Sequence, residues 1–126
     1  MTPLAVPALS DNELQAEASA DNAHIRVRLA GTADVRVVAP LSSFFSSLHT
    51  EAERLATREV VVDLRALEFM NSACFKTFVT WLSRVQRMSP PAQYGIRFLA
   101  NPSRRWQVRS LTALTWFAAD LVTVEA

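Results

Sequence analysis

The sequence predicts one α/β domain, with a mixed sheet of four or five strands and helices packed mainly on one face. Segments with the two-residue period of strands alternate along the chain with longer segments of helical period. Helices between strands favour parallel pairings, joined by right-handed crossovers that place the helices against the sheet. The expected order is strand, strand, helix, strand, helix, strand, helix, strand. At 126 residues the chain is long enough to bury one real core.

The domain is expected to span residues 13–126, after an irregular lead-in over residues 1–12 that contains Pro3 and Pro7. Apolar and polar residues alternate from 13 to 19 and again from 24 to 29. Between them lies a turn at Asp21 and Asn22, whose side chains tolerate left-handed backbone. This pattern predicts a hairpin. We expect Gly31 to end it and to mark a bend or a close backbone approach.

The first helix is expected over residues 40–55, because Pro40 suits a first turn and apolar residues recur at three- and four-residue steps. Val60, Val61 and Val62 form a β-branched run that is typical of an interior strand, so we place them centrally in the sheet. Residues 63–65 are expected to lead away from it. A second helix then carries its apolar side at Phe75, Phe78, Val79, Leu82 and Val85.

Ser89 and the two prolines after it end the second helix, and Gly95 precedes a short strand over residues 96–99. Asn101 and Pro102 are typical of a helix start. The last helix is expected to face the core with Val108, Leu111 and Leu114, while Trp106 falls outside that stripe. Residues 121–124 can add a closing strand.

Composition excludes several classes of function. A net charge of +1 gives no electrostatic case for nucleic acid or an anionic membrane. The local arginine groups, at 84 and 87 and at 104, 105 and 109, are interpreted as solvated helix faces. No apolar run approaches membrane-spanning length, and the N-terminus lacks a signal-peptide pattern. We therefore expect a cytoplasmic protein without direct membrane insertion.

The residues that could carry catalysis are few. His24 and His49 have no metal-ligand spacing, and two glycines cannot build a phosphate-binding loop. The single cysteine excludes an intramolecular disulfide and a cysteine metal cluster. Cys74 could be a reactive thiol near a helix start, although its apolar neighbours favour a small buried hydrophobe. We expect no enzyme, no cofactor and no metal.

The informative segment is Glu-Phe-Met-Asn-Ser-Ala-Cys at residues 68–74. Asn71 and Ser72 are both good helix caps, so the residues alone can be explained as a capping pair. In context, however, residues 60–85 resemble the central signature of STAS domains, in which a strand ending in Asp leads through an apolar connector to an Asp-Ser-(Ser/Thr)-Gly motif. Asp63 matches the strand-end Asp, and Ser72 matches the first serine of the motif.

The resemblance extends beyond this core, from about residue 13 to residue 125. Residues 29–34 resemble the Gly-x-x-Asp turn of the family, and residues 101–102 resemble its Asn-Pro helix start. The sequence departs from the motif at three positions: Asn71 replaces Asp, Ala73 replaces the second hydroxyl residue, and Cys74 replaces Gly. These departures suit a divergent member with its own partner, or one that is no longer phosphorylated.

The resemblance implies a non-catalytic anti-sigma-factor antagonist, a monomer or weak dimer. In such proteins the motif serine is phosphorylated by a serine kinase that is also the anti-sigma factor. The unmodified form binds this partner, and a phosphatase resets the switch. Ser72 inherits the phosphorylated position. The partner surface is expected to comprise Asp34, Asn71, Ser72, Ala73, Lys76 and Thr80.

Two other interpretations remain open. A STAS-like adaptor subunit of a lipid-transporting ABC system or sensor complex would use Ser72 only as a cap. A thiol-dependent enzyme or redox sensor would use Cys74.

Overall fold

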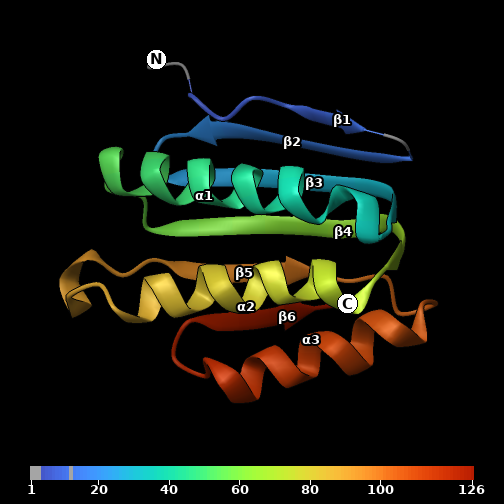
Figure 1. The fold of residues 1–126 in the computed structure, drawn as a ribbon. Coiled ribbons are helices and arrows are strands. Elements are labelled where there is room, and N and C mark those ends of the chain that lie inside the picture. Colours follow the sequence, from blue (N-terminus) through green and yellow to red (C-terminus); the bar gives the residue numbers. More distant parts are fainter. Residues whose placement is uncertain (1–3, 12) are drawn as a thin grey trace.

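A computed structural model describes residues 4–11 and 13–126 of the chain, which form one mixed sheet with three α-helices (Figure 1). The strands are β1 (Leu9–Asp11), β2 (Leu14–Asp21), β3 (His24–Ala33), β4 (Glu59–Met70), β5 (Gly95–Leu99) and β6 (Val122–Glu125). The α-helices are α1 (Val38–Arg54), α2 (Ser72–Gln86) and α3 (Arg105–Phe117), and short 3₁₀ turns lie at η1 (Val35–Val37) and η2 (Pro90–Ala92).

The strands lie in the sheet in the order of the sequence, β1 to β6. β1, β2 and β3 pair antiparallel, whereas β3, β4, β5 and β6 pair parallel. The helices lie on one side of the sheet (Figure 1). The predicted mixed α/β fold is therefore confirmed, and Val60, Val61 and Val62 occupy an interior strand with β3 and β5 on either side.

The lead-in is not irregular throughout, and this adds a sixth strand to the predicted four or five. Leu9–Asp11 form β1, which pairs with β2 at Leu9 and Ala16. The Ala5 N–H donates to Glu51 Oε1 over 2.8 Å, and Arg54 donates to the same carboxylate. These bonds lower the pKa of Glu51 to about 2. The sequence did not predict β1, because a strand of three residues is too short to show the two-residue period. Residues 1–3 and 12 lie outside the described residues.

Gly31 does not end its strand, because β3 continues to Ala33. The expected close backbone approach is confirmed: a Cβ at Gly31 would lie 1.9 Å from the Glu13 carbonyl oxygen. Its φ of +95° is also one that residues with side chains rarely adopt. The Thr32 N–H donates to that same Glu13 oxygen over 3.0 Å. Glycine is thus required where the β2 and β3 backbones meet.

β4 is much longer than the valine run, since residues 63–65 continue the strand instead of leading away from it. Leu64 and Leu67 are fully buried, and pairing with β3 continues as far as Met70. A buried side chain of α3 binds this irregular stretch. Gln107 Nε2 donates to the carbonyl oxygens of Leu64 (2.7 Å) and Leu67 (2.8 Å), while Gln107 Oε1 accepts from the Asn101 N–H over 2.8 Å.

The prediction that Val108 faces the core was wrong, because Val108 is 44% exposed. The buried face of α3 consists of Gln107, which is fully buried, together with Leu111 and Leu114. The helix also begins at Arg105 and not at Asn101. Asn101 Oδ1 instead accepts from the Ser103 N–H over 3.0 Å, forming a turn ahead of the helix. The strand carbonyls that Gln107 satisfies explain why a polar residue faces inward here.

The core between the helices and the sheet is aromatic. Phe78 packs against Phe45 and Phe98 with ring centroids 5.3 Å apart in each pair. Trp81 Nε1 donates to the Tyr94 hydroxyl over 2.9 Å, and that hydroxyl lies 2.6 Å from Nδ1 of buried His49. Burial lowers the pKa of His49. This histidine is a core residue, which agrees with its lack of ligand-like spacing.

We expect Gly31→Ala to reduce the free energy of unfolding by at least about 1 kcal/mol, because a methyl group there clashes with backbone and disfavours the positive φ. Gly95→Ala is the matched control, since its added Cβ would meet only ordinary contacts at 3.8 Å. Urea unfolding followed by circular dichroism measures both. Equal losses for the two variants would contradict the account of Gly31.

Gln107→Leu should lower the free energy of unfolding by about 2–4 kcal/mol, because it leaves two buried carbonyls and one N–H without their partner. Thr112→Ala, an exposed change in the same helix, is the control and should lie within about 0.5 kcal/mol of the parent. If guanidinium unfolding shows Gln107→Leu to be as stable as the parent, Gln107 does not support β4.

Candidate functional site

The candidate site lies at the start of α2. Asn71 is the N-cap residue, with extended backbone, and its Oδ1 accepts from the Ala73 N–H over 2.7 Å. Ser72 is the first helical residue and its side chain is exposed. Of the two residues that the sequence offered as caps, Asn71 therefore makes the cap. The Ser72 hydroxyl stands at the surface in the first turn, where backbone N–H groups and the helix dipole favour negative charge.

The loop that contains Asp34 adjoins this turn, as the sequence interpretation required. Ala33 and Met70 are partners at the ends of the parallel strands β3 and β4. The Asn71 N–H donates to the Ala33 carbonyl over 2.8 Å, and the Cys74 thiol donates to the Asp34 carbonyl over 3.0 Å. The carboxyl ends of two neighbouring strands thus bring the two segments together.

The Asp34 carboxylate bonds within its own loop. It accepts from the Arg36 N–H at 2.9 Å and from Arg36 Nη2 at 2.7 Å. The bonds from Arg36 lower the pKa of Asp34, so the group stays ionised at neutral pH. A protein docking here would meet an ion pair, Asp34 with Arg36, and not a lone carboxylate.

Lys76 and Thr80 are exposed and follow Ser72 at four-residue steps, so the three share one face of α2. Thr80 also lines a hollow of about 90 Å³ between α1 and α2, together with Ser42, Ser46 and Arg84. Ala73 is half-buried and contributes its backbone N–H to the Asn71 cap. The six predicted residues therefore lie along the α2 start, its outer face and the adjoining β3 loop.

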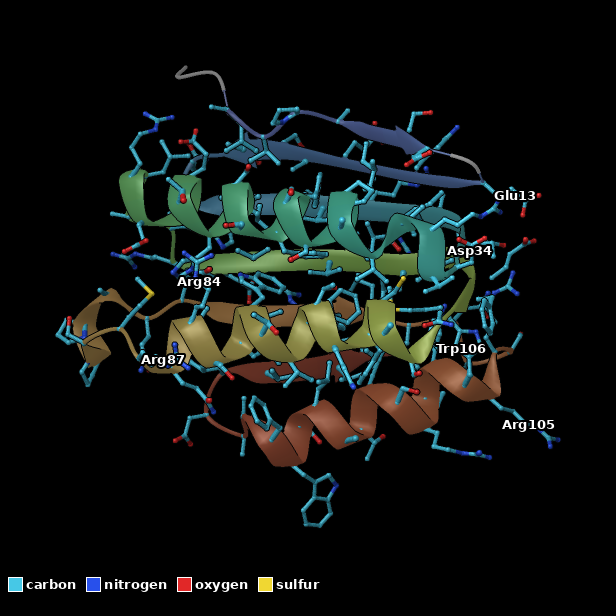
Figure 2. The ribbon with its side chains drawn as sticks, in the orientation of Figure 1. Glu13, Asp34, Arg84, Arg87, Arg105 and Trp106 are labelled. Atoms are coloured by element: carbon cyan, nitrogen blue, oxygen red, sulfur yellow. The ribbon has the colours of Figure 1, made fainter. Side chains whose placement is uncertain are left out.

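Sequence reasoning missed the apolar part of this surface. Phe69 is 50% exposed and Val35 is 64% exposed, and both flank the turn through the β3 and β4 ends. Trp106 is half-buried, and its Nε1 donates to the Glu68 carbonyl over 2.9 Å. Figure 2 shows Trp106 and Asp34 at the same end of the molecule. One sequence feature pointed to Phe69: adjacent strand residues face opposite sides, so Phe69 and Met70 could not both be buried by the helices.

The arrangement around Cys74 does not favour thiol chemistry. The side chain is fully buried, and burial together with the negative charge of Asp34 raises its pKa. The described residues contain no group of three or more His, Cys, Asp or Glu side chains that could hold a metal ion. None of the helices in the described part of the chain is both long and apolar enough to cross a membrane.

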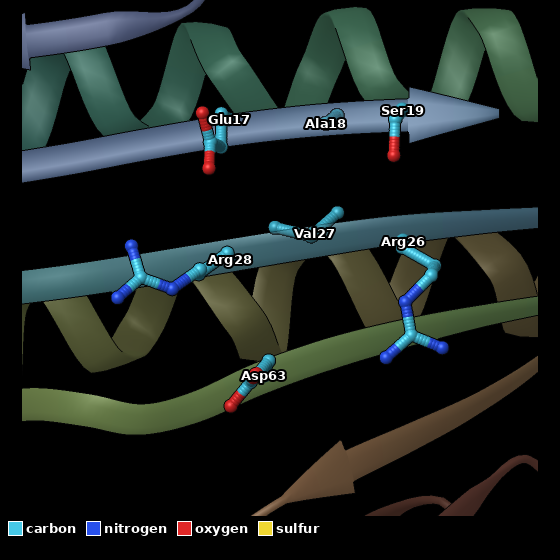
Figure 3. A pocket seen from close by; sticks show the side chains of 7 residues that line it. All are labelled: Glu17, Ala18, Ser19, Arg26, Val27, Arg28 and Asp63. Atoms are coloured by element: carbon cyan, nitrogen blue, oxygen red, sulfur yellow. The ribbon is translucent and has the colours of Figure 1, made fainter.

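A larger hollow, of about 370 Å³, lies on the sheet face opposite the helices (Figure 3). Arg28 pairs in register with Glu17 on one side and Asp63 on the other, so charges of opposite sign alternate across it. Asp63 also accepts from Arg65 Nη2 over 2.9 Å, and the hydrogen bonds from Arg65 lower its pKa. Asp63 does not end its strand, contrary to the match made from the sequence, because β4 continues to Met70.

Comparison with known proteins found no matching family model and no matching curated protein. The solved structures that are similar to the chain include two anti-sigma factor antagonists. An anti-sigma factor antagonist from Mycobacterium paratuberculosis has a TM-score of 0.64 and 17% identity, over 86% of each chain. The anti-sigma factor antagonist SpoIIAA in its unphosphorylated form has a TM-score of 0.54 and 16% identity, over 76% of this chain and 81% of its own. The chain therefore has the STAS-like fold of anti-sigma factor antagonists, as the sequence resemblance predicted.

Proposed function

We propose that this chain is a non-catalytic signalling module that acts as an anti-sigma-factor antagonist in the cytoplasm. It binds a serine kinase that is also an anti-sigma factor, and phosphorylation at Ser72 ends the binding until a phosphatase removes the group. One observation carries the proposal: the exposed Ser72 begins α2 while its neighbour Asn71 makes the cap. Modification of Ser72 therefore leaves the helix start intact.

The contact area that supports this proposal, here called the Ser72 surface, combines polar and apolar groups. Val35 and Phe69 provide exposed apolar area on the strand side, and Lys76 and Thr80 continue the surface along α2. Aromatic and apolar side chains surrounded by polar groups are typical of protein interfaces. The full set is Asp34, Val35, Phe69, Asn71, Ser72, Ala73, Lys76 and Thr80.

A phosphate at Ser72 would act on the partner more than on the fold. It adds a charge of about −1.5 to −2 and sits where α2 presents its free N–H groups, which the fold tolerates. The same charge lies beside Phe69 and Val35, the residues that a bound partner would cover. Placing an unpaired charge in a desolvated apolar contact weakens binding.

A second candidate function uses the same surface without phosphorylation. A STAS-like adaptor, in a lipid-transporting ABC system or a sensor complex, needs a docking face but no switch. Asn71, Ala73 and Cys74 support this alternative, because they remove the acidic group, the second hydroxyl and the glycine of the resembled motif.

Ser72→Glu should weaken binding to the purified kinase-type anti-sigma factor by roughly tenfold or more, whereas Ser72→Ala should bind like the unmodified parent. Calorimetry with each variant measures this, after circular dichroism has verified folding. Ser43→Glu, an exposed serine on α1, is the matched control and should not change affinity. Equal affinities for Ser72→Ala and Ser72→Glu would overturn the switch and leave the adaptor.

Cys74 should react slowly with iodoacetamide in the folded protein at pH 8. Burial and the negative charge of Asp34 raise the pKa of the Cys74 thiol, so less of it is thiolate than in an exposed cysteine, and the sulfur is buried. The urea-unfolded chain is the control and should react many times faster, as followed by mass spectrometry. Native alkylation as fast as in urea would instead favour the thiol-based redox sensor.

A further inference from the structure

The outward face of α3 carries large side chains that the fold does not use. Trp116 is 84% exposed, more than any other large apolar side chain in the described residues. Val108 and Phe117 are 44% and 43% exposed. We call the exposed residues of this helix that are larger than alanine the α3 surface; it consists of Arg105, Val108, Arg109, Thr112, Trp116 and Phe117.

The α3 surface is a continuous stripe on the side of the helix that faces away from the core. Arg105, Arg109, Thr112 and Trp116 follow one another at steps of four, three and four residues, which places them on one side of a helix. The opposite side holds Gln107, Leu111 and Leu114, all buried against the sheet. The Trp116 indole is therefore not required to cover the core.

The charge of this helix is of one sign. Residues 105–117 contain Arg105 and Arg109 and no acidic residue, and the next carboxylate in the sequence is Asp120, beyond the end of the helix. Neither arginine has an ion-pair partner among the described residues. Figure 2 shows Arg105 extending away from the body of the protein. Aromatic and arginine side chains standing together are the residues most often found as binding hot spots.

We propose that the α3 surface binds an acidic segment of a partner protein, in which carboxylates meet Arg105 and Arg109 and an apolar side chain packs on Trp116. Carboxylates pair with the planar guanidinium through two parallel hydrogen bonds. The Trp116 ring supplies a broad apolar platform beside them. This inference does not depend on the proposed role of Ser72.

Two other occupants fit the same face less well. A second copy of the chain would bring four arginines and no carboxylate from the two α3 helices into one contact. A single 13-residue helix is also small for a stable dimer, which needs about 800 Å² on each partner. An anionic membrane would have only two arginines to attract it, and the main apolar face of α3 is already buried in the core.

Trp116, near the C-terminal end of α3, is separate from the Ser72 surface, whereas Arg105 lies at the same end of the molecule as Asp34 (Figure 2). Gln86, the last residue of α2, donates through Nε2 to the Phe117 carbonyl over 3.1 Å, so Trp116 lies near the C-terminal end of α2. Ser72 begins the same 15-residue helix, which is about 20 Å long. The effects of changing Trp116 and of changing Ser72 can therefore be separated.

The test is selection of a displayed random peptide library on the purified parent chain, with Trp116→Ala as the counter-selection. We expect enriched peptides to be rich in Asp and Glu around an apolar residue. A chosen peptide should bind at least tenfold more weakly to Trp116→Ala and to the double variant Arg105→Glu with Arg109→Glu. Its binding should weaken as salt is raised, and the tryptophan emission should shift to shorter wavelength.

Matched controls separate this surface from general effects of charge and aromaticity. Arg26→Glu with Arg28→Glu makes the same change of charge on the far face of the sheet, and Phe69→Ala removes an exposed aromatic at the Ser72 surface. Both controls, and Ser72→Glu, should bind the peptide like the parent. Failure of the Ser72 switch would leave this result unchanged.

Several outcomes would overturn the proposal. The proposal of an acidic partner would be wrong if the enriched peptides had no excess of acidic residues. It would also be wrong if a peptide bound the parent and Trp116→Ala equally. Trp116-dependent dimerisation in sedimentation equilibrium would assign the face to a second copy. Trp116-dependent flotation with phosphatidylglycerol vesicles would assign it to a membrane.

Discussion

The parallel pairing of β3 and β4 is the constraint on which the rest of the structure depends. Because the two strands run side by side to Ala33 and Met70, the loop after one and the helix after the other start at the same edge of the sheet. The hydrogen bond from the Asn71 N–H to the Ala33 carbonyl joins them there. Residues almost forty positions apart in sequence thereby form one surface, and neither segment would present it alone.

Much of this could be predicted from the sequence, because strong periodicity and cap chemistry are local properties. The hairpin and the interior valine strand followed from such patterns, as did the burial of Phe78, Leu82 and Val85 on α2, although Phe75 and Val79 are only half-buried and buried Trp81 was missed. The exposed apolar part of the candidate site could not be predicted from such patterns. Val35 and Phe69 are apolar residues of a kind that usually faces the core, and their place at the ends of the paired strands leaves both exposed to solvent. Gln107 was missed because its partners are carbonyls of a strand forty residues earlier, which no local pattern reveals.

Val61 lies on the face of the sheet that the helices do not cover. It points away from them, yet it is only 4% exposed. Arg26 and Arg97 are its partners on the two neighbouring strands, and the aliphatic stems of long basic side chains can cover apolar surface while their charged ends stay in water. The valine run thus has helices on one side and, on the other, an arginine in register with Val61 on each neighbouring strand.

The two outermost strands are short: β1 has three residues and β6 has four. Unpaired strand edges invite other chains to add to a sheet, and brevity is one of the ways in which proteins limit this. Glu125 on β6 also pairs with Arg97, which places charge on that border. A sheet whose borders are this brief offers another chain few backbone groups with which to extend it.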